Sequence, residues 1–177
     1  MASVFAKRYL PFYIGILVFA ADFFSKYLTD TYLPLMRHNW LWYPYGGIGV
    51  FKNFFGIEFS LSHQINHGAA WGVLATYQLP LLYLRIALIL FLLAYLLFFN
   101  KHQNRNIPIA LIIAGATGNV FDYFIYGHVV DMLHFVLWGY DFPVFNLADS
   151  AIFIGVAYLL GLSLLENHSP KKKARRP

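Results

Sequence analysis

Apolar residues gather in four long runs, and polar or aromatic segments separate them. Each run is about 20 residues long, which is the length of α-helix that crosses a hydrocarbon layer of ~30 Å at ~1.5 Å per residue. The pattern therefore predicts four transmembrane helices in one integral membrane domain that covers residues 1–177. The predicted spans are about 9–28, 79–99, 107–125 and 146–165.

The segment between the first two runs, 29–78, has a different pattern. Between Ile57 and Ser62 apolar residues alternate strictly with polar ones, and this period of two is typical of a β-strand. Aromatic residues and glycines precede that stretch. We therefore expect an all-α membrane protein of four transmembrane helices, with an extracytoplasmic β-rich segment that lies at the membrane surface.

The composition agrees with a membrane protein. Hydrophobic residues make up 59% of the chain and charged residues only 12%, about half of the ~25% that soluble domains carry. The absence of cysteine excludes thiol nucleophiles, disulfides and thiolate metal sites. A net charge of +5 does not indicate nucleic-acid binding, because five of the thirteen basic residues lie in the C-terminal KKKARR segment.

The basic residues predict the orientation in the membrane. Nine of the thirteen Lys and Arg lie on one side if the N-terminus, the 100–106 loop and the C-terminal tail share that side. The positive-inside rule makes this side cytoplasmic. Segments 29–78 and 126–145 are then extracytoplasmic.

Acidic residues point to a site at the extracytoplasmic edge of the membrane. Acids there are costly and need a partner, a wet cavity or a function. Asp131 follows the third span and Asp149 begins the fourth, so the two could converge, share a proton and activate a water. The alternative is that Asp149 only caps its helix, an effect of less than ~1 kcal/mol. The residues alone leave both interpretations open.

Two sets of histidines could instead indicate a metal site. His63 and His67 have the spacing of a zinc-binding helix, but the glutamate expected after the first histidine is absent. His128, Asp131 and His134 could place three ligands on one helical face, although their neighbours fit a strand or loop equally well. Polar loop histidines explain both sets, so we expect no metal and no cofactor.

The remaining charged residues inside the spans allow a different class of function. Asp22, Asp122 and Arg85 could line the path of a small ion-coupled transporter or flippase. Four spans without an inverted repeat, and acids at one membrane edge, argue against this reading. Asp22 and Lys26 are four residues apart and so share a helical face, which suits either a structural ion pair or a ligand contact.

Five short blocks occur in order along almost the whole chain. They are Asp22-x-x-x-Lys26, NHGAAWG at 66–72, GATGNVFD at 115–122, GHVVDM at 127–132 and FNLADSAI at 145–152. With four spans and the topology above, the chain resembles the lipoprotein signal peptidases (signal peptidase II), the aspartic peptidases of the bacterial inner membrane. The chain departs from the family pattern in two places. Position 123 is Tyr where the family commonly has Arg, and segment 29–65 is longer than is usual in the family.

The resemblance implies an activity and a set of residues. It implies cleavage of a prolipoprotein signal peptide just before a diacylglyceryl-modified cysteine, with Asp131 and Asp149 as the catalytic aspartates. Supporting or substrate-binding residues would be Asp22, Lys26, Asn66, Gly68, Asn119, Asp122 and Asn146. The expected partners are diacylglyceryl-modified prolipoproteins and membrane lipid, with no nucleic acid, and the enzyme is expected to be a monomer.

Overall fold

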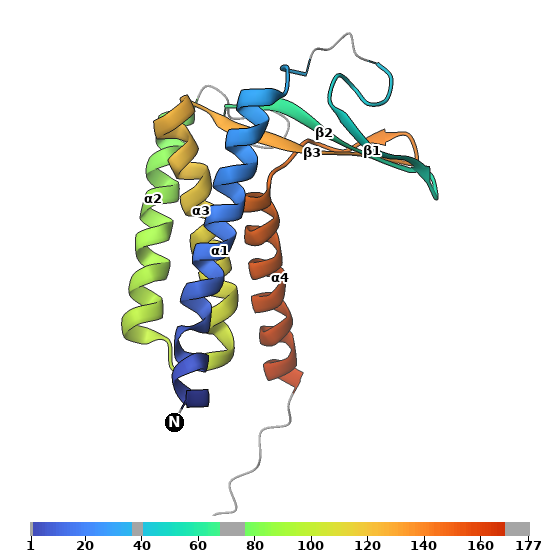
Figure 1. Cartoon of the computed structure of the whole chain (residues 1–177). Coiled ribbons are helices and arrows are strands. Elements are labelled where there is room, and N and C mark those ends of the chain that lie inside the picture. The colour runs from blue at the N-terminus through green and yellow to red at the C-terminus, as the bar shows by residue number, and fades with distance from the viewer. Residues whose placement is uncertain (1, 37–40, 68–76, 169–177) are drawn as a thin grey trace, which may run out of the picture.

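Four helices form an elongated bundle in the computed structural model, which describes residues 2–36, 41–67 and 77–168 (Figure 1). All four are long and apolar enough to cross a membrane, as the sequence predicts. The helices are α1 (Ala2–Tyr32), α2 (Gln78–Ala94), α3 (Asn106–Tyr126) and α4 (Leu147–His168). The π-helical turn η3 (Tyr95–Phe99) continues α2, and the short 3-10 helix η4 (Gln103–Arg105) precedes α3.

A four-stranded antiparallel sheet lies across one end of the bundle and extends beyond α4 (Figure 1). Its strands, in spatial order, are β1 (Ile48–Phe54), β2 (Ile57–Asn66), β3 (Val129–Leu137) and β4 (Tyr140–Asp141). The strand predicted between Ile57 and Ser62 is confirmed as part of β2. The description all-α is imprecise, because the segment between α3 and α4 also supplies two strands, β3 and β4.

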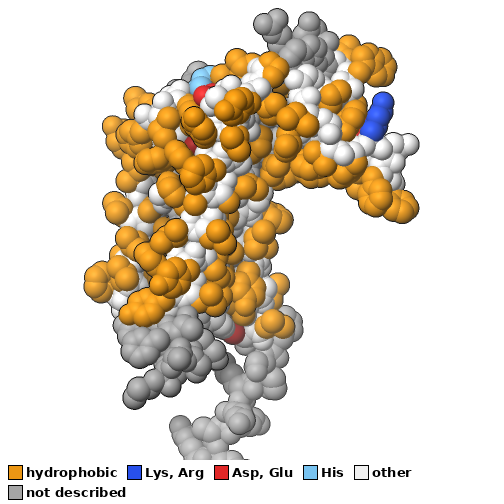
Figure 2. Space-filling view, viewed as in Figure 1, with side chains coloured by type: hydrophobic (Ala, Val, Ile, Leu, Met, Phe, Trp, Pro, Cys, Tyr) orange, Lys and Arg blue, Asp and Glu red, His pale blue; other side chains and the backbone are white. Residues whose placement is uncertain are grey.

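Phenylalanines occupy one face of this sheet. Phe59 of β2 stacks on Phe135 of β3, with ring centroids 4.4 Å apart, and Phe135 in turn stacks on Phe145. The face of the sheet turned toward the helices is mostly apolar in the space-filling view, as are the helix surfaces (Figure 2). This distribution suits a sheet that lies on a bilayer crossed by the helices.

Helix α3 is the centre of the bundle, because it packs against α1, α2 and α4. Glycines make the two closest approaches. A Cβ at Gly115 would lie 2.4 Å from the Ala148 carbonyl oxygen of α4, and one at Gly118 would lie 2.5 Å from Asp22 Oδ2 of α1. The small residues of α3 thus bring polar side chains from three helices into contact.

Candidate active site

A fully buried lysine organises the polar groups at the sheet end of the bundle. Lys26 Nζ lies 2.7 Å from Asp22 Oδ2 and 2.7 Å from Asp122 Oδ2. It also donates a hydrogen bond to Asn119 Oδ1, at 2.9 Å. An ammonium has three protons and no acceptor, and these three oxygens surround it. The Asp22–Lys26 pair is therefore present, and it is extended by two residues of α3.

Two asparagine side chains connect this lysine to the two predicted catalytic aspartates. Asn119 Nδ2 donates to Asp149 Oδ1 (2.8 Å), and Asn119 Oδ1 accepts from Asn146 Nδ2 (3.2 Å). Asn146 Nδ2 also donates to Asp131 Oδ1, at 2.6 Å. Asp131 of β3 and Asp149 of α4 thus belong to one hydrogen-bonded network, although the rest of β3, β4 and the connection to α4 lie between them in the sequence.

Asp131 is the more enclosed of the two carboxyl groups, with 1% of its surface exposed. Its second oxygen accepts a hydrogen bond from Asn66 Nδ2 at the end of β2 (2.9 Å). Burial and the negative charge of Asp149 raise the pKa of Asp131 to about 7, against the opposing effect of its amide donors. This carboxyl group therefore takes up a proton far more readily than an ordinary aspartate.

The start of α4 is capped by a residue other than Asp149. The Asn146 side-chain oxygen accepts the Asp149 backbone N–H at 2.8 Å, which is the usual N-cap arrangement. Asp22 of α1 provides a second acceptor, because its Oδ1 binds the Ala148 backbone N–H at 2.8 Å. The carboxylate of Asp149 is thus left free to accept from Asn119. The sequence did not reveal this division of roles, since it depends on how α1 meets α4.

Gly68 and the rest of its block beyond His67 lie outside the described residues. Arg85 of α2 lines a small cavity together with Asn66, Tyr123 and His128, beside the aspartate network. The acids of the proposed ion path, Asp22 and Asp122, are instead held by Lys26.

The histidines with three-residue spacing are not arranged as one cluster. Strand β3 contains Asp131 and His134 and begins just after His128. His134 is buried, and its Nε2 lies 2.7 Å from Asp141 Oδ1. Its ring also packs edge-on against Tyr45, whose hydroxyl donates to Glu58 Oε2 (2.6 Å). Within the described residues, no three His, Asp or Glu side chains are placed to hold a metal ion.

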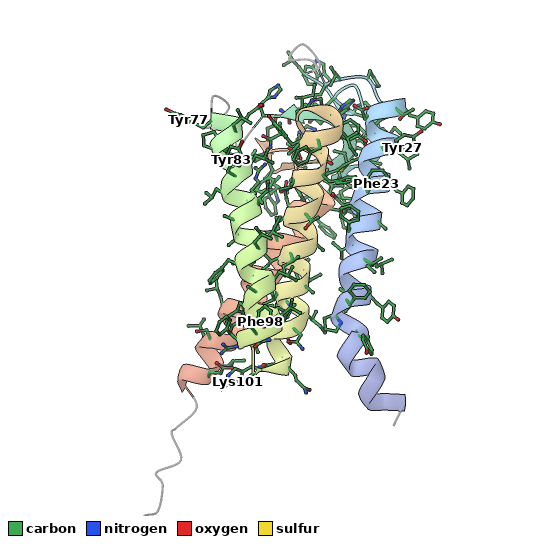
Figure 3. The ribbon with its side chains drawn as sticks, turned by 90° about the vertical axis from the view of Figure 1, so that its left-hand side faces the viewer. Phe23, Tyr27, Tyr77, Tyr83, Phe98 and Lys101 are labelled. Carbon is green, nitrogen blue, oxygen red and sulfur yellow. The ribbon has the colours of Figure 1, made fainter. Side chains whose placement is uncertain are left out.

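Aromatic side chains mark the level of the site on the outside of the bundle. Figure 3 shows Phe23 and Tyr27 on α1, and Tyr77 and Tyr83 at the start of α2, at the same end as the sheet. Such rings are common at membrane–water interfaces. The network of Asp131 and Asp149 therefore lies near one membrane surface.

Comparisons with known proteins agree on one family. The sequence model of the family described as "Signal peptidase (SPase) II" matches residues 14–165. A "Lipoprotein signal peptidase" of Staphylococcus aureus (strain JH9) is 40% identical over 164 residues, which is 90% of each chain. One of Chlamydia trachomatis serovar L2b (strain UCH-1/proctitis) is 34% identical over 168 residues, covering 93% of this chain and 97% of the relative.

Solved structures support the same fold. One described as "Bacterial membrane enzyme structure by the in meso method at 2.3 A resolution" superimposes with a TM-score of 0.75 and 28% identity. It covers 95% of this chain and 94% of that chain. A second membrane enzyme structure, at 1.9 Å resolution, gives a TM-score of 0.68 at 28% identity and covers 88% of this chain and 92% of that one.

Proposed function

The chain belongs to the signal peptidase II family, and we propose that it removes the signal peptides of prolipoproteins by aspartic catalysis at Asp131 and Asp149. Membership makes it a protease and a multi-pass membrane protein. One observation carries the aspartic mechanism: both carboxyl groups belong to the network of Asn119 and Asn146, and the pKa of Asp131 is raised to about 7. The pair therefore retains one proton near neutral pH.

A pair of carboxyl groups with one proton supplies both a base and an acid. The ionised carboxylate removes a proton from a water, whose oxygen attacks the scissile carbonyl carbon. The protonated partner donates to the carbonyl oxygen. When the tetrahedral intermediate collapses, the C–N bond breaks and the nitrogen receives a proton from the pair. Because the charge of Asp149 helps to raise the pKa of Asp131, the two carboxyl groups are coupled, and no fixed role is given to either.

The surroundings of the pair suit a substrate that is anchored in lipid. Asp131 belongs to β3 and Asp149 to the first turn of α4, and β3 and the start of α4 lie where the sheet meets the helix bundle (Figure 1). A diacylglyceryl chain can remain in the bilayer there while the peptide bond before the modified cysteine reaches a polar site. We place this site on the extracytoplasmic side of the bacterial inner membrane, with both termini in the cytoplasm, on the basis of the basic-residue distribution.

The test replaces each acid by its amide. Asp131→Asn and Asp149→Asn keep side-chain size, but an amide cannot accept a proton from water, so each should lower the cleavage rate of a lipidated precursor by about 10²–10⁴-fold. Asp141→Asn is the matched control, because Asp141 is exposed on β4 and binds only His134 among the groups described. Thermal melting confirms that each variant is folded. Near wild-type cleavage by either Asn variant would contradict the mechanism.

A further inference from the structure

A second, larger cavity lies in the opposite half of the bundle. It has a volume of about 750 Å³ and is bounded by α1, α3 and the last turns of α2 with η3. Its floor is a stripe of α3 at helical spacing, namely Ala110, Ile113, Ala114 and Thr117. Helices α1 and α2 both pack on α3 and stand on either side of this stripe (Figure 3). The cavity therefore opens toward the membrane between α1 and α2.

The lining of the cavity includes two asparagine side chains, and a basic residue directly follows one of them in the sequence. Asn100 and Asn106 line the cavity, and Asn100 Nδ2 donates to Asn106 Oδ1 at 2.6 Å. Asn106 Nδ2 donates to none of the described residues, so one amide donor remains available. Lys101 is exposed next to Asn100, and among the described residues it has no acidic partner. Figure 3 shows Lys101 beside Phe98 at the end of the bundle farthest from the sheet.

The neighbouring basic residue is already neutralised. Arg105 forms an ion pair with Glu166 of α4. Lys101 is therefore the described cation of this loop that lacks a counter-charge, and it directly follows Asn100, which lines the apolar groove. A ligand with an apolar chain and an anionic head group matches both parts of the site.

We propose that this groove binds an anionic phospholipid, with an acyl chain along Ala110 and Ala114 and the phosphate between Lys101 and Asn106. The volume lies within the ~300–1,000 Å³ of ordinary ligand sites. A helix with side chains is about 10–12 Å wide and rises ~5.4 Å per turn, so it needs roughly 400–600 Å³ per turn. The groove holds fewer than two such turns. An acyl chain is much thinner, so it fits where a spanning helix does not.

The binding test uses purified protein in neutral detergent with two lipids that share the same chains. Phosphatidylglycerol carries a negative charge, whereas phosphatidylcholine is zwitterionic. Native mass spectrometry counts the retained lipid, and thermal melting reports the stabilisation. We expect preferential retention of phosphatidylglycerol and a higher melting temperature with it. Glycerol phosphate, which has no chains, should leave the melting temperature unchanged, and an equal shift with it would contradict an acyl-chain site.

Paired variants test separately what the acyl chain and the head group of the lipid contribute to binding. Leu93→Trp fills the groove from the α2 side and should remove lipid retention, whereas Leu90→Trp makes the same change one turn away on an exposed position outside the groove. Lys101→Gln should lower the preference for phosphatidylglycerol by about fivefold, and Lys52→Gln on β1 is its control.

Three results would overturn the proposal. The first is equal phosphatidylglycerol retention by Leu93→Trp and Leu90→Trp. The second is an unchanged lipid preference in Lys101→Gln. The third is a Leu93→Trp protein that still binds phosphatidylglycerol but loses affinity for a synthetic signal-peptide helix, because the groove would then hold a helix. All readouts measure lipid or peptide binding or thermal stability, so they do not depend on the peptidase mechanism.

Discussion

Removing the ammonium of Lys26 should destabilise the protein before it affects any chemical step. In Lys26→Met the methylene stem is largely kept, but Asp22, Asp122 and Asn119 each lose a buried donor at 2.7–2.9 Å. Truncating one partner of a buried ion pair costs ~3–5 kcal/mol, because it leaves an uncompensated charge behind. For a chain of this size such a loss lowers the melting temperature by about 6–20 °C.

The assay is thermal unfolding in detergent, followed by tryptophan fluorescence, with the cleavage rate measured well below the transition. Lys52→Met is the matched control, because Lys52 is exposed and contacts only the Tyr43 ring within the described chain. A second variant tests the cause. Adding Asp122→Asn to Lys26→Met removes one orphaned charge, so the double variant should recover roughly 0.5–3 kcal/mol relative to the sum of the single changes.

Two outcomes would contradict this reasoning. If Lys26→Met melts at the wild-type temperature and only its affinity for a lipidated precursor falls, Lys26 is a substrate contact and the buried network does not hold the bundle together. Additive effects of Lys26→Met and Asp122→Asn would also contradict direct electrostatic coupling.

Four further predictions concern the site, the packing and the topology. The cleavage rate should fall as pH rises through about 7, because the carboxyl pair then loses its shared proton from Asp131. A pH–rate profile that still rises one pH unit above that value would contradict the role of this proton. The raised pKa favours the protonated native state, so stability should also fall as pH rises from 3.8 toward 7, and less so in Asp131→Asn. Gly115→Ala should lower stability by ~1–3 kcal/mol because its Cβ meets the α4 backbone, whereas Gly161→Ala, with nothing within 4 Å, should not. Single cysteines at Tyr140 and Lys101 should be labelled from outside and inside respectively, and the reverse result would invert the topology.

The helices were predictable from sequence because a span needs only length and apolarity. Strand β3 was harder, because the apolar residues around Asp131 in 129–133 do not alternate strictly with polar ones. Its pairing partner, β2, also lies more than sixty residues earlier. The i, i+4 spacing of Asp22 and Lys26 predicted their pair. It could not predict that Asp122 and Asn119 complete the lysine's coordination, since those contacts depend on the packing of α1 against α3.

The same limit applies to the two aspartates. The sequence placed Asp131 and Asp149 on one membrane face, and left capping and catalysis open for Asp149. The alternative could be judged only from three-dimensional contacts, in which Asn146 caps α4. The Tyr45–His134–Asp141 contacts were missed entirely. Their only sequence signal is a histidine in an apolar stretch, which does not identify a partner.

The buried Lys26 contacts also constrain the order in which the chain can assemble. Asn119, which accepts from Lys26, lies 93 residues later in the sequence. During synthesis α1 enters the bilayer long before α3 emerges, so its lysine then has only Asp22 on the same helix as a partner. An intramembrane charge that is incompletely compensated is costly. The early chain is therefore expected to remain near the insertion machinery or a water-filled passage, and docking of α3 is the step that commits α1 to the lipid.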